Sequence, residues 1–350
     1  MNSTATSHEN AGKWWISLAS FLLVCSLLVG VMIGPAGPAW WRVPLELINR
    51  LPLFSIHSGL TDTDWSIVWQ IRAPRVVLAA LVGSTLSIAG ASYQGVFRNP
   101  LVDPYLLGVA AGAGLGATIV ITVNRSGTST WWIDPLPLAA FIGGLIAVLA
   151  TYVVGTTGKG ERSSTSLVLS GVAVTSLATA AQTFLLQRNS DVVRQVYSWI
   201  LGRLSSATWS DVRLVIPYVV LSTIALLLHR RLLDVLRVGD DEASALGVNV
   251  SRVRLVVVIA ATLGTASVVA VSGLIGFVGI IVPHAVRLIV GTSYRVVLPV
   301  SLLFGGAFLI LADIPGRVLD NPAETPIGVV TAFLGAPFFL LILRARKTAQ

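Results

Sequence analysis

The sequence predicts an all-α membrane protein with about ten transmembrane helices. Of its 350 residues, 54% are hydrophobic and only 11% are charged, whereas about a quarter of the residues in a soluble domain are charged. The mean hydropathy is +0.81. Apolar runs of about twenty residues, long enough to cross a bilayer as helices, recur along nearly the whole chain. These observations exclude an ordinary soluble domain.

The apolar runs divide the chain into ten expected spans. The first run is too long for a secretory signal, whose apolar core holds about 7–15 residues. The long connection 35–72 is rich in Pro and Trp, and 44–54 is expected to form an amphipathic surface helix. The eighth span is short and rich in glycine, so an irregular or tilted helix is expected. The spans are 14–34, 74–96, 105–123, 135–154, 166–187, 211–229, 253–272, 274–290, 296–314 and 326–343.

The spans form a single polytopic transmembrane domain, 13–346, without a fixed-period repeat. The polar tail 1–12 precedes it and is expected to be disordered. Glycines at Gly112–Gly116 and at Gly305–Gly306 are expected to let neighbouring helices approach closely.

The distribution of basic residues predicts that both termini are cytoplasmic. Ten spans place the termini on one side, and fourteen Lys and Arg then fall inside against ten outside. The net charge of +8 could suggest nucleic acid. In a chain this apolar, however, basic residues typically flank spans, so no nucleic-acid partner is expected. Cys25 lies within an apolar run and is interpreted as a small buried residue.

A polar segment between the sixth and seventh spans has the pattern of a very small helix. Asp240 can act as its N-cap, Asp241 and Glu242 place negative charge at its positive end, and Gly247 can end it in the left-handed conformation. A helix of about six or seven residues is not stable alone in water. Two interpretations stay open: an ordinary capped loop helix, and a docking helix for a cytoplasmic partner.

No catalytic or metal-binding pattern is found in the sequence. The four histidines show no metal-ligand spacing, there is no GxSxG elbow, and the run Gly155–Gly160 lacks the spacing of a phosphate loop. Asp313 is the one acid well inside an expected span, which is little for a proton-coupled carrier. The chain is therefore not expected to be an enzyme or to hold a metal. Energy for active transport would have to enter from a partner.

Many short motifs occur in order along the spans. They include Arg72-Ala-Pro-Arg75, Gly90-Ala-Ser-Tyr-Gln94-Gly95, Arg98-Asn-Pro-Leu-Val-Asp-Pro104, Gly276-Phe-Val-Gly279, Val282-Pro-His284, Leu311-Ala-Asp313 and Leu334-Gly-Ala-Pro337. In this order, from about 71 to 346, the sequence resembles the FecCD-type permeases, the transmembrane subunits of type II ABC importers for iron-siderophores, haem and vitamin B12.

The resemblance implies the type II importer permease fold and a defined set of partners. The chain would pair with a second permease subunit, as a homodimer or heterodimer, in the bacterial cell (inner) membrane. Two cytoplasmic ABC ATPase subunits would carry ATP and Mg, and an extracytoplasmic solute-binding protein would deliver the solute. Membrane lipid would surround the chain as a further partner. The chain itself would bind no cofactor.

The resemblance also implies roles for three sets of residues. The coupling helix at about 240–249 would contact the ATPase through Asp240, Asp241, Glu242, Ala243, Ala245, Leu246, Gly247 and Val248. Three outer arginines of this chain, Arg72, Arg75 and Arg317, would contact acidic residues of the binding protein. The alternative for the first two is snorkelling at the head of a span. Candidates for lining the pathway are Ser170, Thr175, Thr179 and Gln182.

Three further motif positions are interpreted as structural. Asp313 is expected to be a hydrogen-bonded structural acid. His284 is expected to have a structural or gating role rather than to ligate haem, because the family includes permeases for substrates without haem. The segment Arg98-Asn99-Pro100 is expected to form a cytoplasmic turn, either structural or in contact with the ATPase.

We therefore expect the permease subunit of an ATP-driven importer for a bulky metal chelate. An Fe(III)-siderophore is the expected substrate because such substrates are common in the family. Haem and cobalamin are alternatives. A secondary transporter is an alternative of another class, but it would need inverted repeats and buried coupling acids, and neither is found in the sequence. A membrane scaffold without transport is a further alternative.

Overall fold

The computed structural model describes residues 2–35, 37–50, 59–124, 134–156, 164–319 and 323–347. Every regular element in these ranges is helical. Seven helices are long and apolar enough to cross a membrane: α1 (Asn2–Met32), α4 (Ala73–Val96), α6 (Pro135–Thr156), α7 (Ser164–Arg188), α9 (Trp209–Leu228), α12 (Val250–Ser272) and α14 (Tyr294–Val318). Three shorter apolar helices, α5 (Val109–Val123), α13 (Val278–Val290) and α15 (Ile327–Lys347), match the remaining expected spans.

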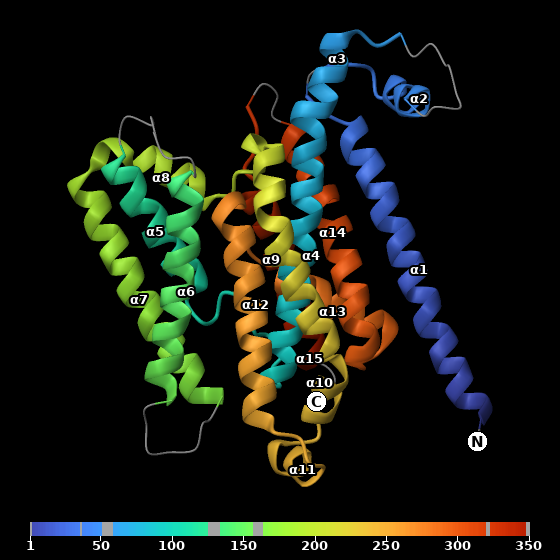
Figure 1. The fold of residues 1–350 in the computed structure, drawn as a ribbon, viewed down its shortest axis with the longest axis vertical. Coiled ribbons are helices and arrows are strands. Elements are labelled where there is room, and N and C mark those ends of the chain that lie inside the picture. The colour runs from blue at the N-terminus through green and yellow to red at the C-terminus, as the bar shows by residue number, and fades with distance from the viewer. Residues whose placement is uncertain are drawn as a thin grey trace.

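The other helices are short and gather at the two ends of the bundle (Figure 1). One end, here called the α3 end, carries α2 (Arg42–Asn49), α3 (Asp62–Ile67) and α8 (Val193–Ile200). A π-helical segment, Val68–Arg72, joins α3 to α4. The opposite end, here called the α11 end, carries α10 (Arg230–Leu236) and α11 (Asp240–Ala245), and both termini lie toward it. Because the chain runs from one end of the bundle to the other an even number of times, its two termini lie toward the same end.

The helices form two packed groups. In the larger group α4 is buried over most of its length and packs against α14, α12, α13 and α9, while α1 lies along α14. The smaller group contains α5, α6, α7 and α8, and it contacts the larger group through α5 and α6 against α12. Figure 1 shows the smaller group on the left, with α7 on its outer side.

Small residues sit where helices approach most closely. A Cβ on Gly305 would collide with Gly83, and a Cβ on Gly112 would collide with Gly143. These contacts confirm the close approach predicted at the glycine motifs, and they hold α14 to α4 and α5 to α6. Gly90 of α4 meets the backbone of Gly279 in α13 in the same way.

The eighth span is short and begins irregularly, in line with the irregular helix expected there. Helix α12 ends at Ser272, and α13 begins only at Val278 and has 13 residues. Phe277 precedes α13 in the left-handed conformation, with φ +68°. Its ring lies where a Cβ on Gly335 of α15 would be, so the strained residue packs the break against the last span.

Two expectations about the first 58 residues have different outcomes. The disordered tail is wrong for the described backbone, because α1 begins at Asn2 and residues 2–12 continue the first span as helix. The amphipathic surface helix is present as α2, with Val43 and Glu46 buried. Residues 51–54 of the expected helix lie outside the described residues.

The run Gly155–Gly160, which lacks the spacing of a phosphate loop, is described only as far as Thr156, at the end of α6.

Candidate functional site

Helix α11 is held in place by ion pairs from two other elements. The Asp240 carboxylate lies 3.2 Å from Nη2 of Arg98, which follows α4, and 3.1 Å from Nη2 of Arg254 in α12. The N-cap position belongs to Gly239, whose φ is +136°. The expected capping role of Asp240 is therefore wrong. Its side chain is turned toward the two arginines instead of toward the helix amides.

The carboxyl end of α11 closes as predicted. Gly247 adopts φ +82°, and its N–H donates to the carbonyl of Ser244 at 2.9 Å. The N–H of Val248 donates to the carbonyl of Ala243 at 3.1 Å. This pair of bonds is a Schellman motif, which stops a helix at a glycine. A six-residue helix thus has defined ends and does not depend on its intrinsic stability.

Most of α11 is exposed. Ala243 is buried against the bundle, whereas Asp241, Glu242 and Ala245 are exposed and Leu246 is 70% exposed. The large apolar side chain of Leu246 is thus exposed at the carboxyl end of a polar helix. Helix α11 lies at the far end of the bundle (Figure 1). This arrangement suits insertion into a groove of another protein more than a connection between two spans.

The Arg98-Asn99-Pro100 segment forms the expected turn. Arg98 is left-handed, with φ +50°, and Asn99 Oδ1 accepts a hydrogen bond from the N–H of Leu101 at 2.9 Å. A few residues further on, the pKa of the Asp103 carboxyl is raised to about 6. Burial is the larger effect and raises the pKa, and the hydrogen bond from the N–H of Tyr105 offsets part of this rise. The Tyr105 hydroxyl donates to the carbonyl of Ile275 at 3.0 Å. The turn thus connects α11 with the break before α13.

The arginines expected to dock a binding protein lie in a buried charge cluster near the α3 end. Arg75 makes two bonds to Asp313, at 2.8 and 2.9 Å, and a third to Glu324 at 2.7 Å. Arg317 Nε donates to the same Asp313 at 2.7 Å. Arg72 Nη1 donates to the carbonyl of Met32 at 2.9 Å. The prediction that Asp313 is a hydrogen-bonded structural acid is confirmed.

The docking role of these arginines stays a prediction. Arg72, Arg75 and Arg317 are only 5%, 6% and 1% exposed in the single chain. A partner could reach them only at an edge of the guanidinium groups, or after their internal bonds exchange. Glu324 is the most accessible member of the cluster, with a side chain that is 30% exposed.

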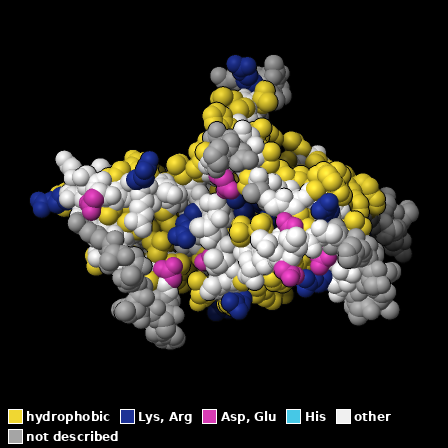
Figure 2. All heavy atoms as spheres, turned by 90° about the horizontal axis from the view of Figure 1, so that it is seen from above, with side chains coloured by type: hydrophobic (Ala, Val, Ile, Leu, Met, Phe, Trp, Pro, Cys, Tyr) yellow, Lys and Arg dark blue, Asp and Glu magenta, His cyan; other side chains and the backbone are white. Residues whose placement is uncertain are grey.

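A polar hollow of about 510 Å³ at the α3 end escaped the sequence reasoning. It is lined in part by Asp191, Arg194, Gln195, Ser198 and Arg203. The available signal was the amphipathic pattern of α8, which buries only Val196 and Trp199. Figure 2, which views this end, shows charges of both signs interspersed among apolar side chains.

The four pathway candidates on α7 do not share one exposed face. Ser170 and Gln182 are buried, and Gln182 donates to Thr118 of α5 at 3.0 Å. Thr175 is half-buried, and Thr179 is exposed. The exposed face of α7 also carries Leu169, Val172, Leu177 and Phe184. The lining role stays a prediction, and within the single chain Thr179 is the candidate most open to it.

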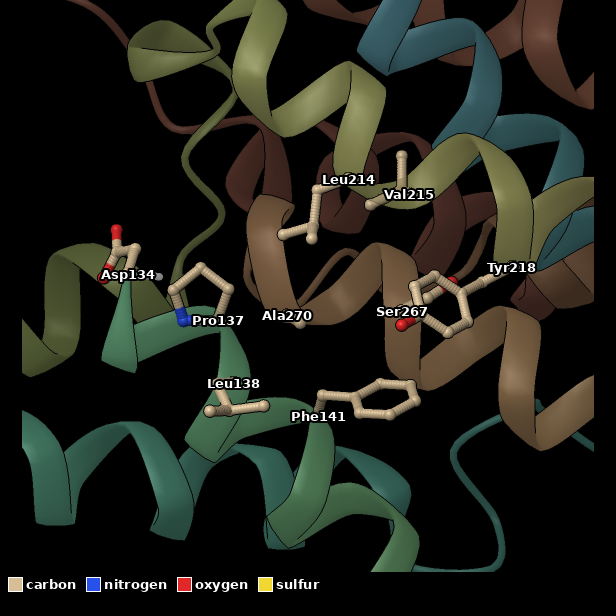
Figure 3. Close-up of a pocket in the computed structure, with 9 residues that line it drawn as sticks. All are labelled: Asp134, Pro137, Leu138, Phe141, Leu214, Val215, Tyr218, Ser267 and Ala270. Carbon is tan, nitrogen blue, oxygen red and sulfur yellow. The ribbon is translucent and has the colours of Figure 1, made fainter. Parts of the chain in front are cut away.

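An apolar hollow separates the two helix groups (Figure 3). Phe141 and Leu138 of α6 face Leu214 and Tyr218 of α9, and the rings of Phe141 and Tyr218 lie 5.4 Å apart. Asp134, at its margin, is the only charged residue among the described residues of the lining. The hollow measures about 60 Å³, so it has little room for a bulky solute.

The comparison with family profiles decides the class of the protein. The profile of the FecCD transport family matches residues 21–345. The chain belongs to this family. Because the family consists of transport permeases, the chain is a transport subunit and not an enzyme, as the sequence predicts. It has several membrane spans and the permease fold of type II ABC importers.

Named relatives match nearly the whole chain. The cobalamin import system permease protein BtuC of Halobacterium salinarum is 39% identical over 95% of this chain and 96% of its own. The hemin transport system permease protein HmuU of Yersinia pestis is 38% identical over 83% and 87%. A solved inward-facing structure of a metal-chelate type ABC transporter has 27% identity and a TM-score of 0.80, covering 94% of this chain and 98% of its own.

Proposed function

We propose that the chain is the permease of an ATP-driven importer and that its substrate is an Fe(III)-siderophore. The names of relatives support a metal chelate, because they print cobalamin, hemin and, at 35% identity, Fe(3+)-citrate for a permease of Bacillus subtilis. Three different chelates at nearly equal identity do not select one. Haem and cobalamin are the alternatives for the substrate test.

The ATP-driven mechanism is supported mainly by the attachment of α11 to the membrane helices through ion pairs. In this proposal α11 is the coupling helix, and the exposed Leu246 enters a groove of a cytoplasmic ATPase that binds ATP and Mg. The ion pairs of Asp240 with Arg98 and Arg254 fasten α11 to α4 and α12. Movement of the ATPase would therefore be passed directly to two membrane helices.

The orientation follows from this assignment. The α11 end is cytoplasmic, and so are both termini, in the inner membrane of a bacterium. The α3 end faces outward and receives the solute-binding protein, for which Arg72, Arg75 and Arg317 remain the proposed contacts. We also propose that the chain pairs with a second permease and that the exposed polar position Thr179 of α7 faces the pathway between the two copies.

The coupling role is tested with Leu246→Asp in the complex purified from native membranes. Because Leu246 is 70% exposed, the substitution should leave thermal stability unchanged. It should lower co-purification of the ATPase and ATP-dependent uptake by at least about tenfold, the effect of losing roughly 1.4 kcal/mol at an interface. Leu319→Asp is the control for ATPase recovery, since Leu319 is a leucine of still higher exposure, 82%, that follows α14 at the opposite end of the bundle. Equal ATPase recovery with both variants would contradict the coupling role.

The substrate is tested by uptake into proteoliposomes that contain the complex and the binding protein recovered with it. Labelled ferrichrome, haem and cobalamin are compared with and without ATP on the ATPase side. ATP-dependent uptake of ferrichrome alone supports the siderophore proposal, and uptake of haem or cobalamin alone replaces it. Uptake that survives without ATP but is abolished by an uncoupler would favour a secondary transporter. ATPase binding without uptake of any probe would favour a scaffold.

A further inference from the structure

A second polar hollow lies at the α11 end, beside the coupling helix but apart from its exposed tip. It measures about 210 Å³ and is lined by Gln94, Gly95, Arg98, Arg237, Arg287 and Tyr294, together with Pro100. Its walls come from the end of α4, the end of α10, the last turn of α13 and the start of α14. We call it the arginine hollow. It has room for several waters, each of which occupies roughly 30 Å³ in the liquid.

Hydrogen bonds hold two of the three arginines of the hollow, Arg287 and Arg237. Gln94 is 2% exposed, its Nε2 donates to the carbonyls of Val102 and Gly279 at 3.2 and 3.1 Å, and its Oε1 accepts from Arg287 at 2.5 Å. Arg237 Nη2 donates to the hydroxyl of Thr292 at 2.8 Å. These contacts orient the guanidinium groups of Arg287 and Arg237 before any ligand arrives.

Positive charge exceeds negative charge around the hollow. The described residues that line it include no carboxylate. Asp234 and Asp240, which pair with the lining residues Arg237 and Arg98, each lie between two arginines, with N–O distances from 3.1 to 3.8 Å. Among the described lining residues three are cations, Arg98, Arg237 and Arg287. The ion pairs of Asp240 and Asp234 bring two more arginines close, Arg254 and Arg295.

We propose that the arginine hollow binds a phosphate group. Three guanidinium groups line one hollow, and a phosphate can accept two parallel hydrogen bonds from a single guanidinium. The position is also suitable, because basic pockets between the cytoplasmic ends of spanning helices bind anionic lipid headgroups. The phosphate can come from such a headgroup or from free phosphate. The site does not depend on the chelate that the transporter carries.

The location links the site to α11. Arg98 belongs to the hollow and also pairs with Asp240 at 3.2 Å, and both side chains are more than 40% exposed. A bound phosphate would compete with Asp240 for Arg98, while Arg254 would still hold α11. Phosphate binding should therefore loosen one of the two fastenings of α11 without releasing it.

The test measures binding to the full-length permease in detergent after removal of native lipid. The probes are dihexanoyl-phosphatidylglycerol, inorganic phosphate, and dihexanoyl-phosphatidylcholine as the zwitterionic comparison. Arg237→Gln removes one guanidinium from the hollow. Arg295→Gln is the matched control, because Arg295 lies 3.7 Å from the same Asp234 but does not line the hollow. Thermal unfolding is recorded for both variants to show that they are folded.

Saturable binding of phosphatidylglycerol that Arg237→Gln weakens about tenfold, and Arg295→Gln less than about twofold, is the expected result. If inorganic phosphate competes in the same way, free phosphate is a sufficient ligand; if it does not, the lipid headgroup is the source. Equal weakening by both variants would mean unspecific attraction and would overturn the proposal. So would equal affinity for phosphatidylcholine, or no saturable binding of either phosphate probe.

Discussion

Arginine side chains have different surroundings in the charge cluster near the α3 end and in the arginine hollow at the α11 end. Near the α3 end Arg75 and Arg317 are buried and share Asp313, with Glu324 completing the cluster. In the hollow the side chains of Arg98 and Arg237 are each 43% exposed, and no carboxylate occurs among the lining residues that the structure describes. Buried arginines with internal partners fasten helices together, whereas exposed arginines around an open hollow are available to a ligand.

The largest expected effect is at the centre of the buried cluster. Asp313→Ala would leave Arg75 and Arg317 without their shared carboxylate, and loss of one partner of a buried ion pair costs about 3–5 kcal/mol. Thermal unfolding in detergent should shift strongly downward. Glu324→Ala is the control and should cost less, because its side chain is 30% exposed. Similar shifts for the two variants would show that burial does not decide the role of this cluster.

A second prediction concerns Asp103. Unlike Asp313, which pairs with Arg75 and Arg317, Asp103 has no ion-pair partner among the described residues. Burial raises the pKa of Asp103 from 3.8 to about 6. The folded protein therefore favours the neutral carboxyl, and this contribution is complete below about pH 4 and is lost as the pH rises through 6. Wild type should lose up to about 3 kcal/mol over this window.

The matched variant is Asp103→Asn, whose amide oxygen can still accept from Tyr105. Its unfolding temperature should fall less than that of wild type between pH 4 and pH 7. The measurement is thermal unfolding of both proteins across this range. Parallel profiles would show that Asp103 does not titrate as its burial requires.

A smaller effect is expected at the end of α11. Gly247 has φ +82°, and no atom lies within 4 Å of the position of a Cβ. Gly247→Ala would therefore act through backbone strain alone, about 1–2 kcal/mol. Amide hydrogen exchange should increase for residues 240–248 and stay unchanged in α12. Faster exchange throughout α12 would mean that α11 is not an independent local unit.

The smallest effect on stability is expected at the exposed pair of Arg98 and Asp240. Ion pairs of this exposure contribute about 0–1 kcal/mol, so Arg98→Gln should barely change the unfolding temperature. The same variant removes a cation from the arginine hollow and should weaken the phosphate probe. A large loss of stability would place Arg98 with the buried arginines and would remove the contrast between the two ends.

The sequence by itself determined the ten helices and the class of protein. Helix length and apolar composition are local properties, and the bilayer requires backbone groups to bond within each span. The glycine motifs, the break after Ser272 and the left-handed end at Gly247 follow from the same local rules. The ordered motifs from Arg72 to Pro337 indicated the family before any contact was known.

Only the tertiary structure decided which charges are partners. Arg75 and Asp313 are 238 residues apart in sequence, and Arg98 and Asp240 belong to different elements. Sequence reasoning assigned Asp240 to its own helix end and Arg75 to an outer partner. It could not find the internal partners, because an ion pair depends on where two distant helices end. The arginine hollow escaped for the same reason, since its arginines meet only when α4, α10 and α13 pack.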